Sequence, residues 1–324
     1  MTVQRETADE IAPDGGVLEG RVARLFFERQ LTKVEIASRL RISRFRVARL
    51  IDRALAEGIV RIEFRDSPAQ DRELGRLVAE RFGIGRCVVA AARDDGVAIV
   101  RLGAEVVDGM LEPGAAIGLA WGSTVARVVR AMPARDDASI EVVQLAGSST
   151  SLAAAADPGD LTLVLAERLG ARHRRIHAPA FVESAALRAA LVREPEVGAT
   201  VARFDAIDFA LVGIGAFGTG PDGALASSSL LRSGALGPEE VRRLTALGAV
   251  GDLLVHPFTA DGRFVAPDLA ERAIAISIEQ LRRVRAVVAV AAGEAKVGAI
   301  RGALASGVVS VLITDAPTAR GIVG

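Results

Sequence analysis

The chain has 324 residues, half of them hydrophobic, and its 40 basic and 40 acidic side chains give a formal net charge of zero. This length suits about two domains, and the zero balance taken alone argues against a nucleic-acid binder. The single cysteine, Cys87, excludes an intrachain disulfide and a cysteine-based zinc site, and the absence of any run of about 18 apolar residues excludes a membrane span.

The N-terminal segment, residues 1–18, has no hydrophobic period and predicts a disordered tail. It is polar and acidic and lacks the apolar centre of a signal peptide, so we expect a soluble, cytoplasmic protein. Charge is unevenly distributed after it, because residues 17–65 carry twelve Arg or Lys against six Asp or Glu, a local balance of +6. A basic segment within a neutral chain is typical of a DNA-binding module joined to a different domain.

Residues 19–65 predict a winged helix-turn-helix. The helical period of a first helix begins at Gly20, and a second helix begins at Thr32, which has the capping-box spacing to Glu35. A third helix begins at Ser43 and ends at Gly58, and the alternating residues 59–64 predict a wing strand. The side chains expected to face inward from the second and third helices are Ile36, Ala37, Leu40, Val47, Leu50, Ile51 and Leu55.

The third helix leaves its arginines on the face opposite its apolar residues. Helix-turn-helix proteins place the N-terminal part of this helix in the major groove, where Arg can donate two hydrogen bonds to a guanine edge. We therefore expect Arg44 and Arg46 to contact bases, and Arg49 and Arg53 to contact phosphates. Phe45 either touches a thymine methyl or folds back against the small domain. The full expected set is Thr32, Lys33, Ser43, Arg44, Phe45, Arg46, Arg49 and Arg53; the alternative for the set is a solvated arginine-rich face.

A different pattern follows the linker predicted at residues 66–70. Apolar runs of about five to seven residues alternate with helical stretches, which predicts strands buried on both faces of a parallel α/β sheet. The predicted strands are residues 87–92, 115–120, 140–145, 209–214, 286–292 and 308–314. The predicted helices include residues 71–81, 161–169 and 238–247. We expect residues 66–324 to form one effector-binding and oligomerisation domain.

Three predicted strand ends carry residues that suit an anion. Trp121-Gly-Ser-Thr124 follows one strand and opens a helix, so backbone N–H groups, hydroxyls and the helix dipole favour negative charge; the alternative is a simple tight connection. Gly147, Ser148 and Ser149 follow a second strand. Lys296 follows a third, and as one of only two lysines among forty basic residues its compact ammonium suits a phosphate, unless it is an ordinary surface lysine. Carboxyl ends of parallel strands gather at the edge where α/β sheets bind ligands.

The histidines do not indicate a metal site. His173 and His177 lie four residues apart, but neighbouring arginines, Arg172, Arg174 and Arg175, would repel a cation. His256 precedes Pro257 in a predicted loop and has no partner visible in the sequence. We expect no metal and no cofactor.

Several motifs in one order along the chain resemble the SorC family of sugar-responsive bacterial transcriptional regulators. They are residues 21–27, 58–62, 118–125, 208–215, 248–252, 291–296 and 312–315. The resemblance implies a winged helix-turn-helix, an effector domain similar to the sugar-phosphate isomerase and glucosamine-phosphate deaminase fold, a phosphorylated sugar as effector, operator DNA as partner, and a homodimer or homotetramer.

The resemblance also assigns residues. Trp121–Thr124 and Lys296 match the family's ligand edge, and Asp252 and Asp315 match its motifs. The residues expected to bind the effector are then Trp121, Gly122, Ser123, Thr124, Gly147, Ser148, Ser149, Asp252 and Lys296. One departure is Arg41, which stands in the turn where such motifs carry Gly and would cost about 1 kcal/mol if its φ is positive. Another is the serine cluster after Gly147, which is longer and richer in alanine than the family pattern.

The alternative function is a sugar-phosphate isomerase or deaminase with an appended DNA-binding module. Such chemistry needs a carboxylate base with a second acid or a histidine near the sugar. No pair of carboxylates follows a predicted strand end, and Asp252 stands alone. We therefore expect a DNA-binding regulator of carbohydrate metabolism with no catalytic residues, and not an enzyme.

Overall fold

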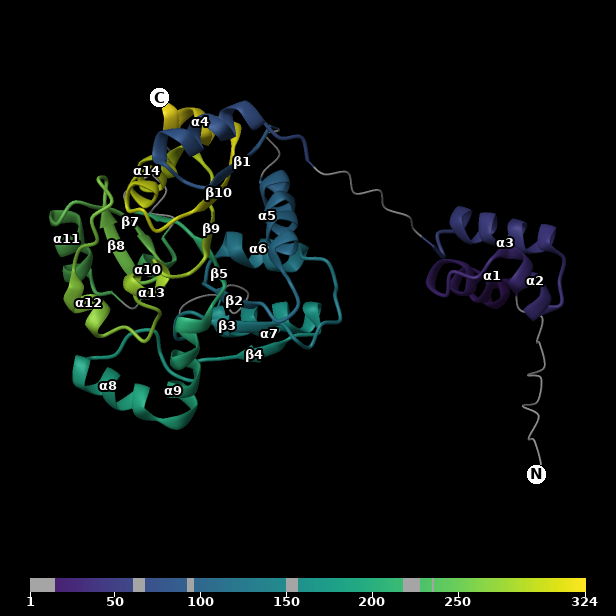
Figure 1. Ribbon diagram of the computed structural model, residues 1–324, viewed down its shortest axis with the longest axis horizontal. Coiled ribbons are helices and arrows are strands. Elements are labelled where there is room, and N and C mark those ends of the chain that lie inside the picture. Colours follow the sequence, from purple (N-terminus) through teal and green to yellow (C-terminus); the bar gives the residue numbers. More distant parts are fainter. Residues whose placement is uncertain (1–14, 61–67, 92–95, 150–156, 218–227, 235) are drawn as a thin grey trace. The chain divides into compact units, whose positions relative to one another are not determined.

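The computed structural model describes residues 15–60, 68–91, 96–149, 157–217, 228–234 and 236–324. The chain forms two compact units, residues 1–66 and 67–324 (Figure 1). Within the described ranges, no helix is both long and apolar enough to cross a membrane.

The described part of the N-terminal unit contains three α-helices. They are α1 (Gly15–Ala23), α2 (Lys33–Leu40) and α3 (Arg44–Ala56), and a π-helical turn, η1 (Arg24–Glu28), continues α1. The prediction of a disordered tail over residues 1–18 is wrong for residues 15–18, which are helical; residues 1–14 lie outside the described part. The wing strand predicted at 59–64 falls mostly on undescribed residues, and Ile59 and Val60 form a bend.

The starts of α2 and α3 confirm the two predicted caps. Thr32 Oγ1 accepts a hydrogen bond from the Glu35 amide, and the Glu35 carboxylate accepts one from the Thr32 amide, which completes the capping box. Ser43 Oγ accepts a hydrogen bond from the Arg46 amide. The connection between the helices passes through Arg41, whose φ of 53° is in the left-handed region. A residue with a Cβ is strained there, as expected for a position where glycine is usual.

The three helices enclose a small core. Its buried residues are Val22, Ile36, Leu40, Val47, Leu50 and Ile51, with Ala37 half-buried against them. The inward prediction is wrong for Leu55, which is 36% exposed, while Ala54 is fully buried. The stripe at 47, 50, 51 and 54 continues the i, i+3, i+4, i+7 spacing, so position 55 lies at its margin.

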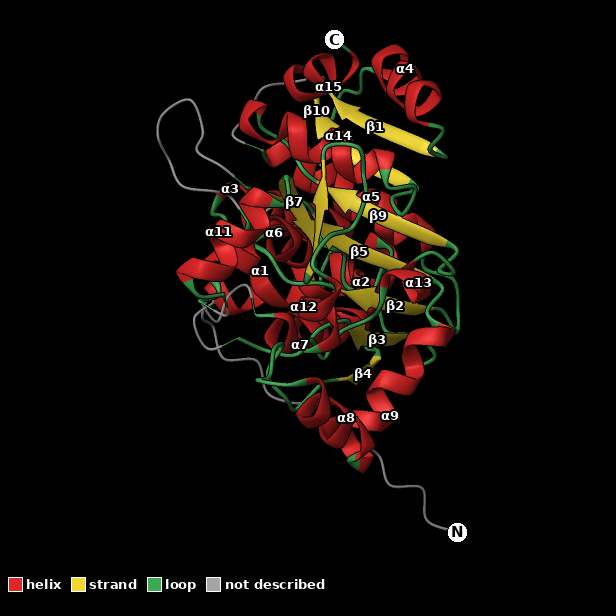
Figure 2. Cartoon of the chain, turned by 90° about the vertical axis from the view of Figure 1, so that its left-hand side faces the viewer, coloured by secondary structure: helices red, strands yellow, loops and turns green. Residues whose placement is uncertain are grey.

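The larger unit is built on a parallel sheet of seven strands in the order β1-β10-β9-β5-β2-β3-β4 (Figure 2). All six predicted strands are confirmed as β1 (Arg86–Ala90), β2 (Ala116–Leu119), β3 (Glu141–Gln144), β5 (Phe209–Gly213), β9 (Ala286–Val290) and β10 (Val311–Asp315). The unpredicted strand, β4 (Arg172–Arg174), lies at the sheet edge with all three residues exposed. Charged side chains on an edge strand discourage pairing with another chain.

Helices cover both faces of this sheet. One core lies under α5, α6 and α7 and a second under α4, α14 and α15. Val88 and Val89, neighbours in β1, belong to opposite cores, since successive side chains in a strand point to opposite faces. This double burial explains the continuous apolar runs of the sequence.

The helices predicted at 71–81, 161–169 and 238–247, and the one after Trp121, are confirmed. The helices of the larger unit are α4 (Arg72–Phe82), α5 (Val97–Met110), α6 (Ser123–Ala131), α7 (Pro158–Leu169), α8 (Ala185–Arg193), α9 (Pro195–Val201), α10 (Ser229–Arg232), α11 (Pro238–Ala246), α12 (Pro267–Glu271), α13 (Ile278–Leu281), α14 (Val297–Ala305) and α15 (Ala316–Val323), with 3₁₀ turns η3 (Ala202–Ala206) and η4 (Glu294–Lys296). Gln70, at the end of the predicted linker, already pairs with Ala90 beside the sheet.

A small antiparallel sheet was not predicted. It consists of β6 (Gly215–Ala216), β7 (Ala249–Leu253) and β8 (His256–Thr259). The prediction of a loop at His256 is therefore wrong: the ring is buried in β8, and its Nε2 lies 2.8 Å from the Ile276 carbonyl oxygen. Short strands interrupted by glycine and proline give too weak an alternation to be recognised.

Candidate functional site

A cleft opens beyond the carboxyl ends of β2, β5 and β9, at the middle of the parallel sheet. From β2 the chain runs outward through β3 and β4, and from the neighbouring β5 it runs the other way through β9 and β10. Ligands of open α/β sheets bind at such a reversal of strand order. The lining residues are Ala120, Trp121, Gly122, Ser123, Thr124, Val125, Gly213, Ile214, Gly215, Ser229, Asp252, Leu254, Val290 and Lys296.

The turn from β2 into α6 forms one wall. Gly122 has φ 126° and ψ 150°, a conformation essentially restricted to glycine, and it leaves α6 without a side-chain cap. The first N–H groups of such a helix are left for water or a ligand. Ser123 is exposed and Thr124 half-buried beside them, whereas Trp121 is 3% exposed and belongs to the core beneath.

Asp252 reaches the cleft from the small sheet. Its residue is 3% exposed, and Ser228 Oγ donates a hydrogen bond of 2.5 Å to its Oδ1. Gly215 lies opposite it in the β6–β7 pairing, and a Cβ on Gly215 would come within 2.1 Å of Asp252 Oδ1, so the carboxyl occupies space that only glycine leaves. Burial raises the pKa of Asp252 to about 7, although the Ser228 hydrogen bond and the charge of Lys296 act in the opposite direction.

Lys296 supplies a cation to the same cleft. Its Nζ donates a hydrogen bond to the Ile214 carbonyl oxygen at 3.0 Å. Burial lowers the pKa of Lys296, the charge of Asp252 raises it, and Arg232 nearby lowers it further. The cleft thus combines an ammonium, a carboxyl, three hydroxyl side chains and an uncapped helix start.

The structure separates Gly147, Ser148 and Ser149 from this cleft. The two serines line another cavity, with Arg175, His177 and Ser233. Ser148 Oγ donates to Asp157 Oδ1 at 3.1 Å, and the Ser149 amide donates to Asp157 Oδ2 at 3.2 Å. A Cβ on Gly147 would lie 2.5 Å from the Pro179 carbonyl oxygen, which accounts for glycine there by close packing. The predicted effector residues therefore fall into two groups.

One cleft residue, Ser229, was missed in the sequence, as was Ser228, which is not part of the cleft lining but donates a hydrogen bond to Asp252. They end the hydroxyl-rich run at 227–229, a Ser/Thr cluster ahead of a helix, which was a usable signal. Asp315, which matched a family motif, caps α15 by accepting a hydrogen bond from the Thr318 amide at 2.9 Å.

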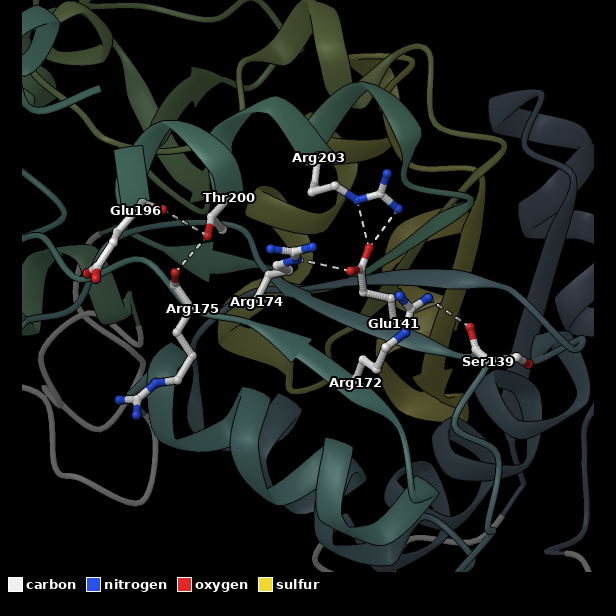
Figure 3. Close-up of polar contacts among 8 residues, drawn as sticks. All are labelled: Ser139, Glu141, Arg172, Arg174, Arg175, Glu196, Thr200 and Arg203. Carbon is white, nitrogen blue, oxygen red and sulfur yellow. Dashed lines mark hydrogen bonds and ion pairs between the residues drawn. The ribbon is translucent and has the colours of Figure 1, made fainter. Parts of the chain in front are cut away.

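Glu141 of β3 meets two arginines, Arg174 of β4 and Arg203 of η3 (Figure 3). Arg174 Nε lies 3.1 Å and Arg203 Nη2 2.6 Å from its two carboxylate oxygens. Burial alone would raise the pKa of Glu141, but these two arginines hold it below its ordinary value. His173 and His177 are exposed, and among the described residues no group of three or more His, Cys, Asp or Glu is arranged to hold a metal.

The arginine face of α3 is open to solvent. Arg44, Phe45, Arg46 and Arg49 are exposed, and Phe45, at 67% exposure, is not part of the small core. The Arg44 guanidinium carbon lies 4.9 Å from the centre of the Phe45 ring.

The other expected DNA-binding residues have partners within the unit. Arg53 Nη1 lies 3.1 Å from Oε1 of the buried Glu19. The hydroxyls of Thr32 and Ser43 serve as helix caps, and Lys33 Nζ lies 5.9 Å from the centre of the Phe26 ring.

Comparisons with known proteins agree over nearly the whole chain. Residues 66–324 match the family Sugar-bind, a sugar-binding domain. The chain is 30% identical over 314 residues to the sorbitol operon regulator of Klebsiella pneumoniae, covering 93% of this chain and 95% of that protein. It is 31% identical over 310 residues to the erythritol catabolism regulatory protein EryD of Brucella abortus (strain 2308), covering 94% of this chain and 95% of that protein. The crystal structure of the full-length sorbitol operon regulator SorC from Klebsiella pneumoniae is similar with a TM-score of 0.72 and 29% identity, covering 95% of this chain and 99% of that chain.

Proposed function

The chain belongs to the SorC family of sugar-responsive transcriptional regulators, and we propose that a phosphorylated sugar bound in the cleft beyond β2, β5 and β9 controls its binding to operator DNA. It is a carbohydrate-responsive regulator and not an enzyme, since its relatives are named as regulators of sugar operons. We further propose that it acts in the cytoplasm as a homodimer or homotetramer, because two-fold operators pair with two-fold proteins.

The observation that carries the effector proposal is the meeting of Lys296 with the Trp121–Thr124 turn in one cleft. A phosphate dianion is favoured by an ammonium, by the N–H groups of an uncapped helix start and by the hydroxyls of Ser123 and Thr124. Asp252 suits the sugar end of the ligand, because a carboxyl with a pKa of about 7 can accept from or donate to a hydroxyl. The separate cavity lined by Ser148 and Ser149 is the alternative place for the phosphorylated sugar to bind.

We propose that α2, the turn at Arg41 and α3 form a helix-turn-helix within residues 19–65, and that residues 66–324 form the effector domain with the isomerase-like fold. The capped starts of α2 and α3 and the exposed arginines of α3 support the first part. The parallel sheet with helices on both faces supports the second. In this arrangement Arg44 and Arg46 contact bases, while Arg49 and Lys33 contact phosphates.

A thermal-shift screen tests the effector site, with the unchanged protein compared with two variants in each of which one lysine is replaced. A sugar phosphate at about 100 times its Kd should stabilise the protein by about 2.7 kcal/mol, and the unphosphorylated sugar should not. Lys296→Met should lose this stabilisation and keep its affinity for an operator selected from random duplexes. Lys33→Met is the matched control, because it removes the chain's other lysine; it should keep the ligand response and weaken DNA binding. Equal stabilisation of Lys296→Met and the unchanged protein would contradict the proposed site.

A further inference from the structure

Another cavity, of about 290 Å³, lies beside the small antiparallel sheet and shares no lining residue with the cleft or with the Ser148 and Ser149 cavity. Residues of β8, of the chain around α12 and α13, and Arg188 of α8 line it. Pro257, on its wall, lies opposite Asp252 in the β7–β8 pairing. The cavity is therefore one strand away from the effector cleft but opens elsewhere.

Most of the wall is apolar. Its larger apolar residues are Phe264, Val265, Pro267 and Ile278, and its small ones are Ala266, Ala270, Ala273 and Ala275. Ala266, also in the wall, is buried with φ 56° and ψ 62°. A residue with a Cβ is strained in that conformation, and such strain is concentrated at binding sites. A space of this size suits the apolar body of a small molecule.

The polar side chains of the wall are few, and they include two arginines, one carboxylate and a histidine. His256 Nε2 must carry a proton, since it lies 2.8 Å from the Ile276 carbonyl oxygen. Burial lowers the pKa of His256, so the ring is neutral and its Nδ1 is a hydrogen-bond acceptor. Within the described part of the chain, Nδ1 has no hydrogen-bond partner.

The wall contains two arginines and one carboxylate. Arg188 Nε donates to the Ala273 carbonyl oxygen at 2.8 Å, and Arg282 Nη2 donates to the Ser306 carbonyl oxygen at 3.3 Å. Each guanidinium has five N–H donors, so each keeps donors for a ligand. Glu279 is the only acidic lining residue and is exposed, so the wall carries one positive charge in excess.

We propose that this cavity is a second ligand site, which binds a small carboxylate with an apolar body and a donor group. The carboxylate binds Arg188 and Arg282, the apolar body packs between Phe264, Val265 and Ile278, and the donor, a hydroxyl or amine, bonds to His256 Nδ1. Neither an unphosphorylated sugar, which lacks apolar surface, nor a neutral hydrocarbon, which leaves the arginines without an anion, matches this wall.

Fluorescence of 8-anilinonaphthalene-1-sulfonate tests the site on the full chain, because this probe combines an anion, two apolar ring systems and an N–H donor. Octanoate should displace it at least about tenfold more effectively than octanol. Arg188→Gln should weaken octanoate binding about tenfold, since one charged hydrogen-bond partner is lost. Arg242→Gln, which removes an exposed arginine of α11, is the matched control and should leave octanoate binding unchanged.

Ala270→Leu gives an independent answer that does not depend on charge. It should fill part of the cavity and exclude both probe and octanoate, so it also decides the matter if Arg188→Gln fails to fold. The proposal is overturned if octanoate and octanol compete equally, or if Ala270→Leu binds octanoate as tightly as the unchanged protein. It is also overturned if Lys296→Met abolishes octanoate binding while Arg188→Gln does not, because the probe would then lie in the effector cleft.

Discussion

Replacing Asp252 with Asn should make the folded protein more stable, by an amount that grows with pH. The pKa of Asp252 in the folded protein is about 7 because the carboxyl is buried, and its ordinary value is 3.8. Asn keeps the shape and an oxygen that accepts the Ser228 hydrogen bond, but it cannot ionise. The variant therefore removes the cost of ionising a buried carboxyl and leaves the packing against Gly215 in place.

The stabilisation should grow with pH because the pKa of Asp252 is raised in the folded protein. A pKa that is higher in the folded state than in the unfolded state means that folding takes up a proton, so the contribution to stability is complete below about pH 4 and is lost as pH rises through 7. Each pKa unit corresponds to about 1.4 kcal/mol. The unchanged protein should therefore lose about 2–3 kcal/mol of stability through this group between pH 5 and pH 8. Asn at this position loses nothing over that interval.

Thermal unfolding at pH 5 and pH 8 measures the effect. For a unit of this size, about 2–3 kcal/mol corresponds to roughly 5–10 °C in Tm, so the gap between the variant and the unchanged protein should widen by that amount at pH 8. Asp136→Asn, which removes an exposed carboxylate, should show the same gap at both pH values. A gap for Asp252→Asn that stays constant, or that widens toward pH 5, would refute the assignment of a raised pKa to Asp252.

Three further predictions concern the N-terminal unit. Arg41→Gly should raise its stability by up to about 1 kcal/mol, because glycine relieves the φ of 53°; a lower urea midpoint, followed by circular dichroism, would contradict this. Arg53→Ala should cost about 1–2 kcal/mol by leaving the buried Glu19 carboxylate without its arginine, and the loss should nearly vanish in a Glu19→Gln background. Arg44→Ala should weaken binding to the selected operator by about 1–3 kcal/mol and relax the base preference of the protein, whereas loss of a phosphate contact would weaken binding to all sequences alike.

Local features of the chain were predictable from sequence because their causes are local. The caps at Thr32 and Ser43 depend on residues three positions apart, and the buried strands depend on continuous apolar runs. Leu55 shows the limit of this reasoning: helical periodicity ranks positions around an axis but does not decide where a small core ends. In that helix the smaller Ala54 is buried and the larger Leu55 is at the rim.

The composition of the cleft depended on tertiary structure. Asp252 reaches it through the β6–β7 pairing with Gly215, in a sheet too short to give a sequence pattern, and only a family motif pointed to it. The same limit applies to Ser148 and Ser149, which line a different cavity. Ser148 and Ser149 follow β3, the immediate neighbour of β2, yet hydrogen bonds to Asp157 hold them in a different cavity. Which strand-end residues meet is decided by the loops after the strands, not by strand order alone.

The charges of the cleft explain how a bound ligand would change the free energy of the folded protein. Both Lys296 and Asp252 lie in the described part of the chain, and no ion pair joins them; Lys296 bonds to the Ile214 carbonyl oxygen and Asp252 accepts from Ser228. Each therefore has its pKa displaced toward the neutral form by burial. In the proposed function a phosphate beside Lys296 would supply a counter-charge, so its binding should raise the pKa of Lys296 and offset the cost of burying the ammonium. A regulator can shift its DNA-binding equilibrium only by the difference in ligand affinity between its two states. A cleft in which a movement of either wall changes the distance between Lys296 and the phosphate provides such a difference, and a neutral residue at position 296 would not.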